Sequence, residues 1–452
     1  MRVGFVMVFL VCQVFLFAKP GDLDIGFGTN GIVTTNIGSG DDDTIESIAI
    51  QADGKIVAGG YAYEENEAGD NDWLFALARY NPNGTLDTTF GTNGKVMTDI
   101  GNGDDDTIYS IAIQTDGKIV VGGYAHEIDG EGNDRFIFAL ARYNPDGTLD
   151  TTFGTNGKVM TDIGNGDDDT IYSIAIQADG KIVAGGYAYE IDGEGNDGLL
   201  FALVRYNPDG TLDTTFGTNG KVTTDVGSGD DDTIYSIAIQ ADGKIVAVGY
   251  SENNTDRSFT VARYNPDGSF DTTFGRSGIV ITDMGENGSS DKAYDVALQR
   301  DGKIVVVGVE DAGKNYIFAM ARYNPDGSLD TTFGKNGKVT TDIGSGSDKA
   351  RSVAIQNNGK IVVAGYSSFD GNYAFSLVRY LSDGALDTTF GTDGKVITDI
   401  GSKADRANSM ALQKDGKIVA AGFSSGDDGD VFALVRYEGD TLTLTPIYYL
   451  LQ

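Results

Sequence analysis

Short apolar runs rich in β-branched and aromatic residues alternate along the chain with clusters of Gly, Asn and Asp. In one representative stretch, these runs occupy residues 95–100, 108–114, 118–124 and 136–143. Short runs of this composition between turn-forming clusters are typical of β-strands, and no stretch shows convincing helical periodicity. Asp116-Gly117 predicts a hairpin between the second and third runs, and Pro145-Asp146-Gly147 predicts a turn after the fourth.

This pattern of four strands occurs seven times. A Phe-Gly pair marks every copy, at intervals of 57 to 63 residues, and its phenylalanines are Phe27, Phe90, Phe153, Phe216, Phe274, Phe333 and Phe390. A fixed period of this size indicates one supersecondary unit that is repeated. Seven four-stranded units without helices predict an all-β fold, a seven-bladed β-propeller of antiparallel blades. A β-solenoid with long rungs is the alternative.

The run Ser-Ile-Ala-Ile-Gln-x-Asp-Gly-Lys-Ile-Val resembles the inner hairpin of NHL-type propellers. By this analogy 108–114 is an innermost strand, 118–124 and 136–143 follow outwards, and 158–160 and its neighbours form the outermost strand. Residues 31–37 are then an outer strand with no blade before it, and the last unit lacks its outer strand. We expect the N-terminal strand to complete the last blade and close the ring. The alternative is closure by the tail, residues 442–451.

Residues that recur in all seven copies have structural interpretations, because a single active site needs residues that differ between blades. Leu149 and Phe153 are predicted to be buried anchors between blades. Arg142 is predicted to be buried and paired with an aspartate, with Tyr143 covering it.

Three runs carry a family resemblance: Gly-Thr-Leu-Asp-Thr-Thr-Phe-Gly at 147–154, Ile-Ala-Ile-Gln-x-Asp-Gly-Lys-Ile-Val, and Phe-Ala-Leu-Ala-Arg-Tyr-Asn-Pro-Asp-Gly. Together they resemble the delta-60 repeat of bacterial exported proteins, over about residues 22–437. The resemblance implies a propeller and an extracytoplasmic setting. It carries no established activity and no catalytic residues. The tail after Tyr437 departs from the pattern.

Composition narrows the range of functions. The 452 residues carry 33 Lys and Arg against 67 Asp and Glu, a net charge of −34, which argues against binding nucleic acid or an anionic membrane surface. Residues 1–18 have the short basic start and apolar stretch of a secretory signal peptide, and the only cysteine, Cys12, lies within them. We expect a propeller over 19–437 and a tail over 438–452, exported as a secreted, periplasmic or cell-surface monomer without a membrane span.

Candidate chemistry lies in two types of loop, which the predicted strand order places on one face of the ring. The first type joins the outer strand of one blade to the inner strand of the next and carries Asp triplets in four copies, and the second type joins the second and third strands of a blade. Later copies carry Asp291-Lys292, Asp348-Lys349 and Asp405-Arg406, so this face is predicted to be strongly acidic over four blades and nearly neutral over three. Clustered carboxylates repel one another unless a cation or water screens them, and dense oxygen ligands suit Ca²⁺. The alternative is a solvated acidic rim. The candidate Ca²⁺ ligands are Asp41, Asp42, Asp43, Asp104, Asp105, Asp106, Asp167, Asp168, Asp169, Asp230, Asp231 and Asp232.

Other motifs give weaker signals. Residues 127–134 and 190–197 alternate acidic residues with Gly but lack the distal Glu of an EF-hand. Gly-x-Gly-x-x-Gly at 193–198 opens no helix, and Gly-x-Ser-x-Gly at 422–426 has neither the following helix nor the later His of a nucleophile elbow; we interpret the latter as a loop at a strand end. His126 is interpreted as a surface loop residue, and Trp73 as packing at a blade edge.

The favoured hypothesis is an exported, non-catalytic propeller that binds a protein or glycan partner through its acidic loop face. Ca²⁺ is the favoured small partner and a basic peptide the next. The second hypothesis is a glycan-cleaving enzyme that uses paired carboxylates as acid and base; against it, no carboxylate pair stands apart from its repeat equivalents. A purely structural surface protein is the third.

Overall fold

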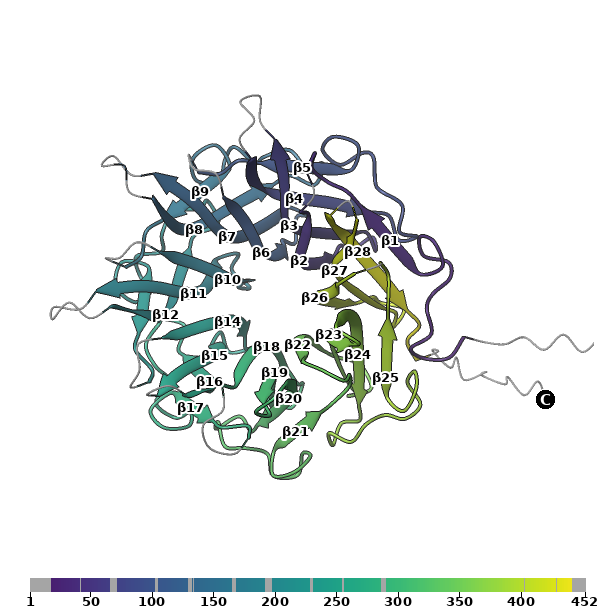
Figure 1. The fold of residues 1–452 in the computed structure, drawn as a ribbon. Helices are drawn as coiled ribbons and strands as arrows, with labels where there is room; N and C mark the ends of the chain where they lie inside the picture. The colour runs from purple at the N-terminus through teal and green to yellow at the C-terminus, as the bar shows by residue number, and fades with distance from the viewer. Residues whose placement is uncertain are drawn as a thin grey trace, which may run out of the picture.

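The computed structural model describes residues 18–440, except 41, 66–70, 102–104, 129–131, 133, 165–167, 192–196, 228–230, 254–255, 286–289, 402 and 428. Within these residues, 28 strands form seven four-stranded antiparallel sheets. Figure 1 shows the sheets arranged as blades around a central axis. The predicted seven-bladed β-propeller is therefore confirmed. The described part of the chain includes no helix that is long and apolar enough to cross a membrane.

Each blade runs from an inner to an outer strand. The inner strands are β2 (Thr44–Ile50), β6 (Asp106–Ile113), β10 (Asp169–Ile176), β14 (Asp232–Ile239), β18 (Lys292–Leu298), β22 (Asp348–Ile355) and β26 (Asp405–Leu412). The second strands are β3 (Ile56–Glu65), β7 (Ile119–Ile128), β11 (Ile182–Ile191), β15 (Ile245–Asn253), β19 (Ile304–Asp311), β23 (Ile361–Phe369) and β27 (Ile418–Gly426). The third strands are β4 (Asn71–Tyr80), β8 (Asp134–Tyr143), β12 (Asp197–Tyr206), β16 (Asp256–Tyr264), β20 (Tyr316–Tyr323), β24 (Asn372–Tyr380) and β28 (Gly429–Tyr437). The outer strands are β5 (Lys95–Thr98), β9 (Lys158–Thr161), β13 (Lys221–Thr224), β17 (Ile279–Thr282), β21 (Lys338–Thr341), β25 (Lys395–Thr398) and, in the last blade, β1 (Ile32–Thr35).

Blades are numbered here from the first (β2–β5) to the seventh (β26–β28 with β1). β1 pairs antiparallel with β28, from Ile32 opposite Val435 to Thr35 opposite Phe432. Figure 1 shows this N-terminal strand beside the last blade of the chain. The N-terminal strand thus closes the ring, as predicted, whereas the alternative segment 442–451 lies outside the described residues.

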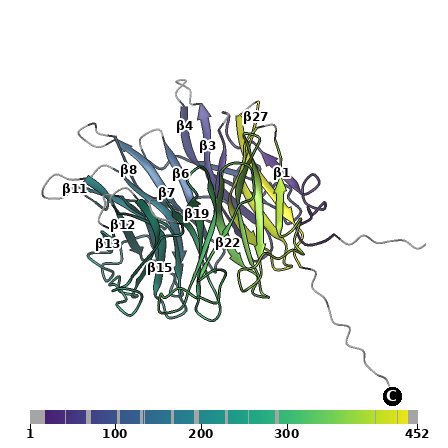
Figure 2. The same cartoon turned by 60° about the horizontal axis from the view of Figure 1, so that its bottom comes forward.

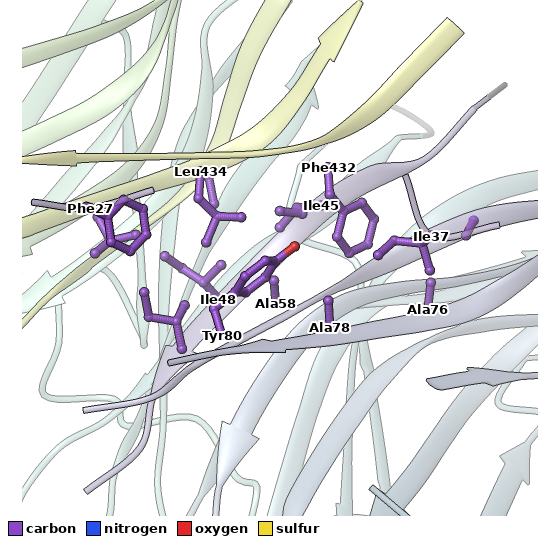
Figure 3. Packing of buried hydrophobic residues seen from close by; sticks show 14 residues of the cluster. Phe27, Ile37, Ile45, Ile48, Ala58, Ala76, Ala78, Tyr80, Phe432 and Leu434 are labelled. Carbon is purple, nitrogen blue, oxygen red and sulfur yellow. The ribbon is translucent and has the colours of Figure 1, made fainter. Parts of the chain in front are cut away.

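Apolar clusters fill the spaces between neighbouring blades. The cluster at the closure joins Phe27 and Leu434 of the seventh blade to Ile48 and Tyr80 of the first, and Figure 3 shows these side chains packed together. The phenylalanine of each Phe-Gly pair is completely buried. Because a buried Phe side chain contributes about 1.5–3 kcal/mol, seven such anchors hold the blades at fixed spacing and keep the channel geometry rigid.

The repeated Arg-Tyr pair has two separate structural roles. Nε of Arg142 donates a 2.7 Å hydrogen bond to Asp150, which confirms the predicted Arg–Asp pair. The aromatic ring that covers the guanidinium is Phe153, at 4.5 Å, and the prediction that Tyr143 covers it is wrong. Tyr143 is buried between blades and its hydroxyl donates to Thr98 over 2.9 Å.

The second and third strands extend further than their apolar runs predict. Pairing of β7 with β8 continues to Ile128 opposite Asp134, so His126 lies in a strand and not in a surface loop. Its imidazole packs 5.3 Å from the ring of Phe136, and 15% of the side chain is exposed. β27 likewise continues to Gly426, which places Gly-x-Ser-x-Gly within a strand and not in a loop. Backbone pairing needs no apolar side chain, so polar ends of hairpins stay in the sheet.

Candidate functional site

The strand ends gather on two opposite faces of the ring, as Figure 2 shows from another angle. We call the face where the inner strands begin the mouth face; it contains Asp106, Asp134 and their counterparts. A bridge between Phe136 of the second blade and Asp168 ties the two loop types together on this face. The predicted clustering of both loop types on one face is therefore confirmed.

The third aspartate of each predicted triplet is a structural cap. Asp43, Asp106, Asp169 and Asp232 are buried, and each accepts a hydrogen bond of 2.5–2.7 Å from the backbone amide six residues earlier. Burial raises the pKa of Asp106 to about 7 despite these hydrogen bonds. The fifth to seventh blades use Asp291, Asp348 and Asp405 in the same way, so this residue belongs to the fold.

The other predicted ligands do not form a visible metal site. Among the second aspartates, Asp42 is exposed and Asp105, Asp168 and Asp231 are half-buried; Asp231 accepts from Arg257 over 2.9 Å. The first aspartates, Asp41, Asp104, Asp167 and Asp230, lie outside the described residues. Within the described part of the chain, no three His, Cys, Asp or Glu side chains converge as metal ligands. Ca²⁺ binding at these loops stays a prediction.

A different set of residues lines the central channel. In every inner strand the pairing register slips by one residue. A β-bulge of this kind leaves one residue unpaired and redirects its side chain. The seven bulge residues, together with the residue that follows each, line a cavity of about 150 Å³. The bulge residues are Glu46, Tyr109, Tyr172, Tyr235, Tyr294, Arg351 and Asn408.

Four tyrosines form a continuous arc along this wall. The ring centroids of Tyr109, Tyr172, Tyr235 and Tyr294 are 4.8, 4.9 and 5.0 Å apart in turn, and the guanidinium of Arg351 lies 4.6 Å over Tyr294. Burial raises the pKa of each of these phenols above its ordinary value. The hydroxyls therefore stay protonated and can donate hydrogen bonds to a ligand.

Two carboxylates of the channel have no counterpart in the other blades. Burial raises the pKa of Glu46 to about 7, although the positive charge of Arg351 opposes this shift. Asp295 replaces the serine of the other six blades and accepts from the Ser236 hydroxyl and the Val353 amide, both at 2.8 Å. The inference that no carboxylate pair stands apart from its repeat equivalents is wrong for the channel wall, because it compared the carboxylates of the loops only.

Three cations mark the mouth of the channel on neighbouring blades. Lys292, Lys349 and Arg406 follow the capping aspartate, where the first four blades carry a buried Thr. Each lies over an aromatic ring: Lys292 Nζ is 4.7 Å from the Tyr250 centroid, Lys349 Nζ is 5.2 Å from that of Tyr316, and Arg406 Cζ is 4.6 Å from that of Tyr373.

Within the described part of the chain, these mouth cations form no ion pair. Among the described residues, no carboxylate oxygen lies within 4 Å of Lys292, Lys349, Arg351 or Arg406, and Nε of Arg406 is buried without a hydrogen-bond partner. Burial first, and then the charges of Arg257 and Lys349, lower the pKa of Lys292 to about 8. In a chain of net charge −34, Lys292, Lys349, Arg351 and Arg406 thus form a local cluster of positive charge.

Comparison with known families is consistent with the repeat. Seven segments match the sequence model of a family described as a domain of unknown function (DUF5122) beta-propeller, at residues 51–90, 114–153, 177–216, 240–274, 299–333, 356–390 and 413–440. They cover more than half of the chain. The chain belongs to the DUF5122 β-propeller family. The resemblance of this DUF5122 propeller to the delta-60 repeat stays a prediction.

Several solved structures are similar to this DUF5122 protein. Sqt1 from Chaetomium thermophilum is 13% identical, with a TM-score of 0.39 over 90% of this chain and 100% of that chain. The polysaccharide lyase Uly1 is 12% identical (TM-score 0.45; 87% and 89% covered), and YCF48 bound to D1 peptide is 14% identical (TM-score 0.42; 95% and 100% covered). At such identities only the fold is comparable. No curated protein matches the chain.

The channel residues of this DUF5122 propeller were missed because apolar patterning does not mark them. The signal was nevertheless present in the sequence. Aligned on the Ser or Asp that follows, the bulge position reads Glu, Tyr, Tyr, Tyr, Tyr, Arg and Asn over the seven copies. A functional site that occurs once in the molecule needs residues that differ between blades. A position that varies inside an otherwise repeated strand is therefore a candidate for such a site. Trp73, by contrast, packs 5.5 Å from the ring of Tyr61, in agreement with the predicted packing.

Replacing Glu46 by Gln is expected to remove one pH-dependent contribution to stability. The pKa of Glu46 is about 7 in the folded protein against an ordinary 4.5, so the folded state holds a proton that the unfolded state releases. The stability associated with this proton is present below pH 4.5 and lost as pH rises through 7. Because the Glu46 side chain is only partly shielded from water, we expect Glu46→Gln to be more stable than wild type by about 1–2 kcal/mol at pH 8 and equal at pH 4.

Urea denaturation at pH 4, 6 and 8 measures this difference directly. Glu190→Gln serves as the control, because Glu190 is also half-exposed but lies at the end of β11, outside the channel. A stability difference between wild type and Glu46→Gln that is the same at all three pH values would contradict the expected titration.

Proposed function

We propose that this protein is an exported, non-catalytic propeller that binds an anionic ligand at the mouth of its central channel. One observation carries the proposal: Lys292, Lys349, Arg351 and Arg406 gather on the fifth to seventh blades without a carboxylate partner among the described residues. The predicted signal peptide and the delta-60 resemblance support export. Ca²⁺ at the acidic loops is a separate proposal.

The fold itself does not require these cations. Thr44, Thr107, Thr170 and Thr233 occupy the position of Lys292 in the first four blades, and those blades form the same four strands. A partly buried cation without a counter-charge is unfavourable, and the chain has 67 Asp and Glu from which partners could have come. Cations held only against aromatic rings are available to an anion that supplies the missing charge.

The same cavity raises a second candidate function, cleavage of a glycan. Glu46 and Asp295 are two channel carboxylates with raised pKa values, as a general acid requires. Asp295, however, already accepts hydrogen bonds from Ser236, Val296 and Val353 and replaces a serine that links blades in the same way. This leaves Glu46 as one uncommitted carboxyl group where two are needed, so binding is favoured. Release of glycan fragments by wild type but not by Glu46→Gln would reverse this preference.

Binding of dextran sulfate tests the proposal. The variant Lys292→Thr/Lys349→Thr/Arg406→Thr carries the residue that the first four blades use, so its fold should be retained. We expect wild type to bind dextran sulfate at 50 mM NaCl and the triple variant to bind about tenfold or more weakly, a loss of about 1.4 kcal/mol or more. Titration calorimetry with neutral dextran in parallel measures the electrostatic part.

The matched control removes three exposed cations on the opposite face of the ring, in Arg276→Thr/Lys335→Thr/Lys414→Thr. It changes the net charge by the same amount, and its affinity should equal that of wild type. Equal weakening in both triple variants would indicate a general charge effect and would overturn the site, as would the absence of binding to wild type.

A further inference from the structure

We propose that the anionic ligand is a carboxylated sugar, whose ring lies against the tyrosine arc while its carboxylate meets Arg351 and the mouth cations. This inference rests on the proposed anion-binding function and names the ligand class. It combines three features of the channel: its hydrogen-bonding groups, its shape, and the one-sided position of its charge.

The channel wall has many unused hydrogen-bonding groups. The hydroxyls of Tyr109, Tyr172 and Tyr235 make no hydrogen bond with the described residues of the protein. Asn408, which lines the same cavity, donates its amide to the Ile45 carbonyl over 3.0 Å, and its side-chain oxygen accepts no hydrogen bond from the described residues. A wall that presents several hydroxyl donors and an amide acceptor suits a ligand with several hydroxyl groups of its own.

The shape of the channel suits one ring. The tyrosines along the arc are tilted by 51–56° to their neighbours, and all of them line the cavity. A cavity of about 150 Å³ is of the size that holds one six-membered ring. Aromatic walls with a few well-placed polar groups are typical of small-molecule sites. A simple inorganic anion would use the cations and leave this wall without a role.

The charges lie on one side of the channel. The tyrosine arc spans the second to fifth blades, whereas Lys292, Lys349 and Arg351 lie on the fifth and sixth. Burial first, and then the charges of Arg351 and Arg406, lower the pKa of Lys349, so these cations lie close enough to repel one another. Glu46 of the first blade disfavours a second anionic group near it. One negative group per ring therefore fits better than the dense charge of a sulfated polymer.

The test compares carboxylated sugars with matched probes by titration calorimetry. The acidic probes are trigalacturonate, a mannuronate trimer and a hyaluronan tetrasaccharide, which differ in stereochemistry. The matched neutral probe is fully methyl-esterified trigalacturonate, and citrate supplies carboxylates without a sugar ring. We expect at least one acidic sugar to bind wild type about tenfold or more tightly than citrate, and the methyl ester to bind about tenfold more weakly than trigalacturonate if that trimer is the one bound.

Two variants borrow residues from other blades at the same bulge, which keeps the fold. Arg351→Tyr should weaken acidic sugars and dextran sulfate alike. Tyr235→Asn should weaken the acidic sugar about tenfold and leave dextran sulfate unchanged. Dextran sulfate binding without binding of any acidic sugar, or with no effect of Tyr235→Asn on either probe, would overturn the sugar while the anion site stands. Loss of all binding by wild type would overturn both.

Discussion

Deleting the N-terminal residues up to 36, and with them β1, is expected to abolish cooperative folding. A protein of residues 19–452, which keeps β1, should fold cooperatively. Removing β1 leaves β28 as an unpaired edge, and Phe27 no longer fills the closure cluster. Loss of a buried Phe costs about 3–5 kcal/mol, and an orphaned buried charge costs a further 3–5 kcal/mol or so. Together these losses approach the whole stability of a typical domain, about 5–15 kcal/mol.

The orphaned charge would be Arg436. In the closed ring, Asp24 Oδ2 accepts from Arg436 Nε over 2.7 Å and from Lys417 Nζ over 2.6 Å. Asp24 is 5% exposed, so this pair is largely shielded from water. Although burial of Asp24 acts in the opposite direction, the hydrogen bonds from Lys417 and Gly26 and the charge of Arg436 hold its pKa below the ordinary value.

Guanidinium denaturation and limited proteolysis would measure the effect. The competing view, closure by residues 442–451, predicts the reverse ranking: the protein ending at Asp440 would be the unstable one, and the protein starting at residue 37 would unfold as wild type does. A smaller substitution isolates the anchor. Phe27→Ala should cost about as much as Phe153→Ala, about 3–5 kcal/mol each, if closure packs as tightly as an internal boundary between blades.

The architecture was predictable because each strand and turn signal occurs in seven copies of the repeat. A single hairpin signal such as Asp116-Gly117 is ambiguous, but seven copies in phase leave few folds open. The unpaired strand near residue 32 and the missing outer strand after Tyr437 together predict closure, and the pairing of β1 with β28 confirms it. Register, strand number and ring closure are all properties of the backbone that a periodic pattern determines.

The candidate site was not predictable in the same way, because it depends on departures from the repeat. The density of carboxylates in the acidic loops predicted a metal site there. In the structure, however, Asp106 and its equivalents are buried and accept hydrogen bonds from backbone amides. Tyr109 and Arg351 enter the channel only because a β-bulge turns them there, and the sequence does not show a bulge. Phe153 covers Arg142 from the far side of a turn. The adjacency of Arg142 and Tyr143 in the sequence suggested the wrong aromatic partner.

Replacing Arg142 by Ala is expected to lower the free energy of unfolding by about 3–5 kcal/mol, because it removes the buried partner of a buried carboxylate and leaves only the more exposed Lys118 beside it. Asp150 is 4% exposed and accepts from Arg142 Nε over 2.7 Å and from Lys118 Nζ over 2.8 Å. Arg142 also donates to the Pro208 carbonyl of the next blade, so its loss weakens the contact between blades as well.

The loss should depend on pH. Burial alone would raise the pKa of Asp150, but hydrogen bonds from Lys118 and Thr152 and the charge of Arg142 outweigh it and hold the pKa well below the ordinary 3.8. The pair therefore stabilises the folded protein above pH 3.8, and its contribution is lost as pH falls below that value. The difference in the free energy of unfolding between Arg142→Ala and wild type should be largest near pH 7 and smaller at pH 2.5.

Lys118→Ala is the matched control, because Lys118 is 27% exposed and its loss should cost about 1 kcal/mol or less. Equal, pH-independent losses in both variants would mean that Phe153 packing, and not the buried ion pair, holds this part of the blade.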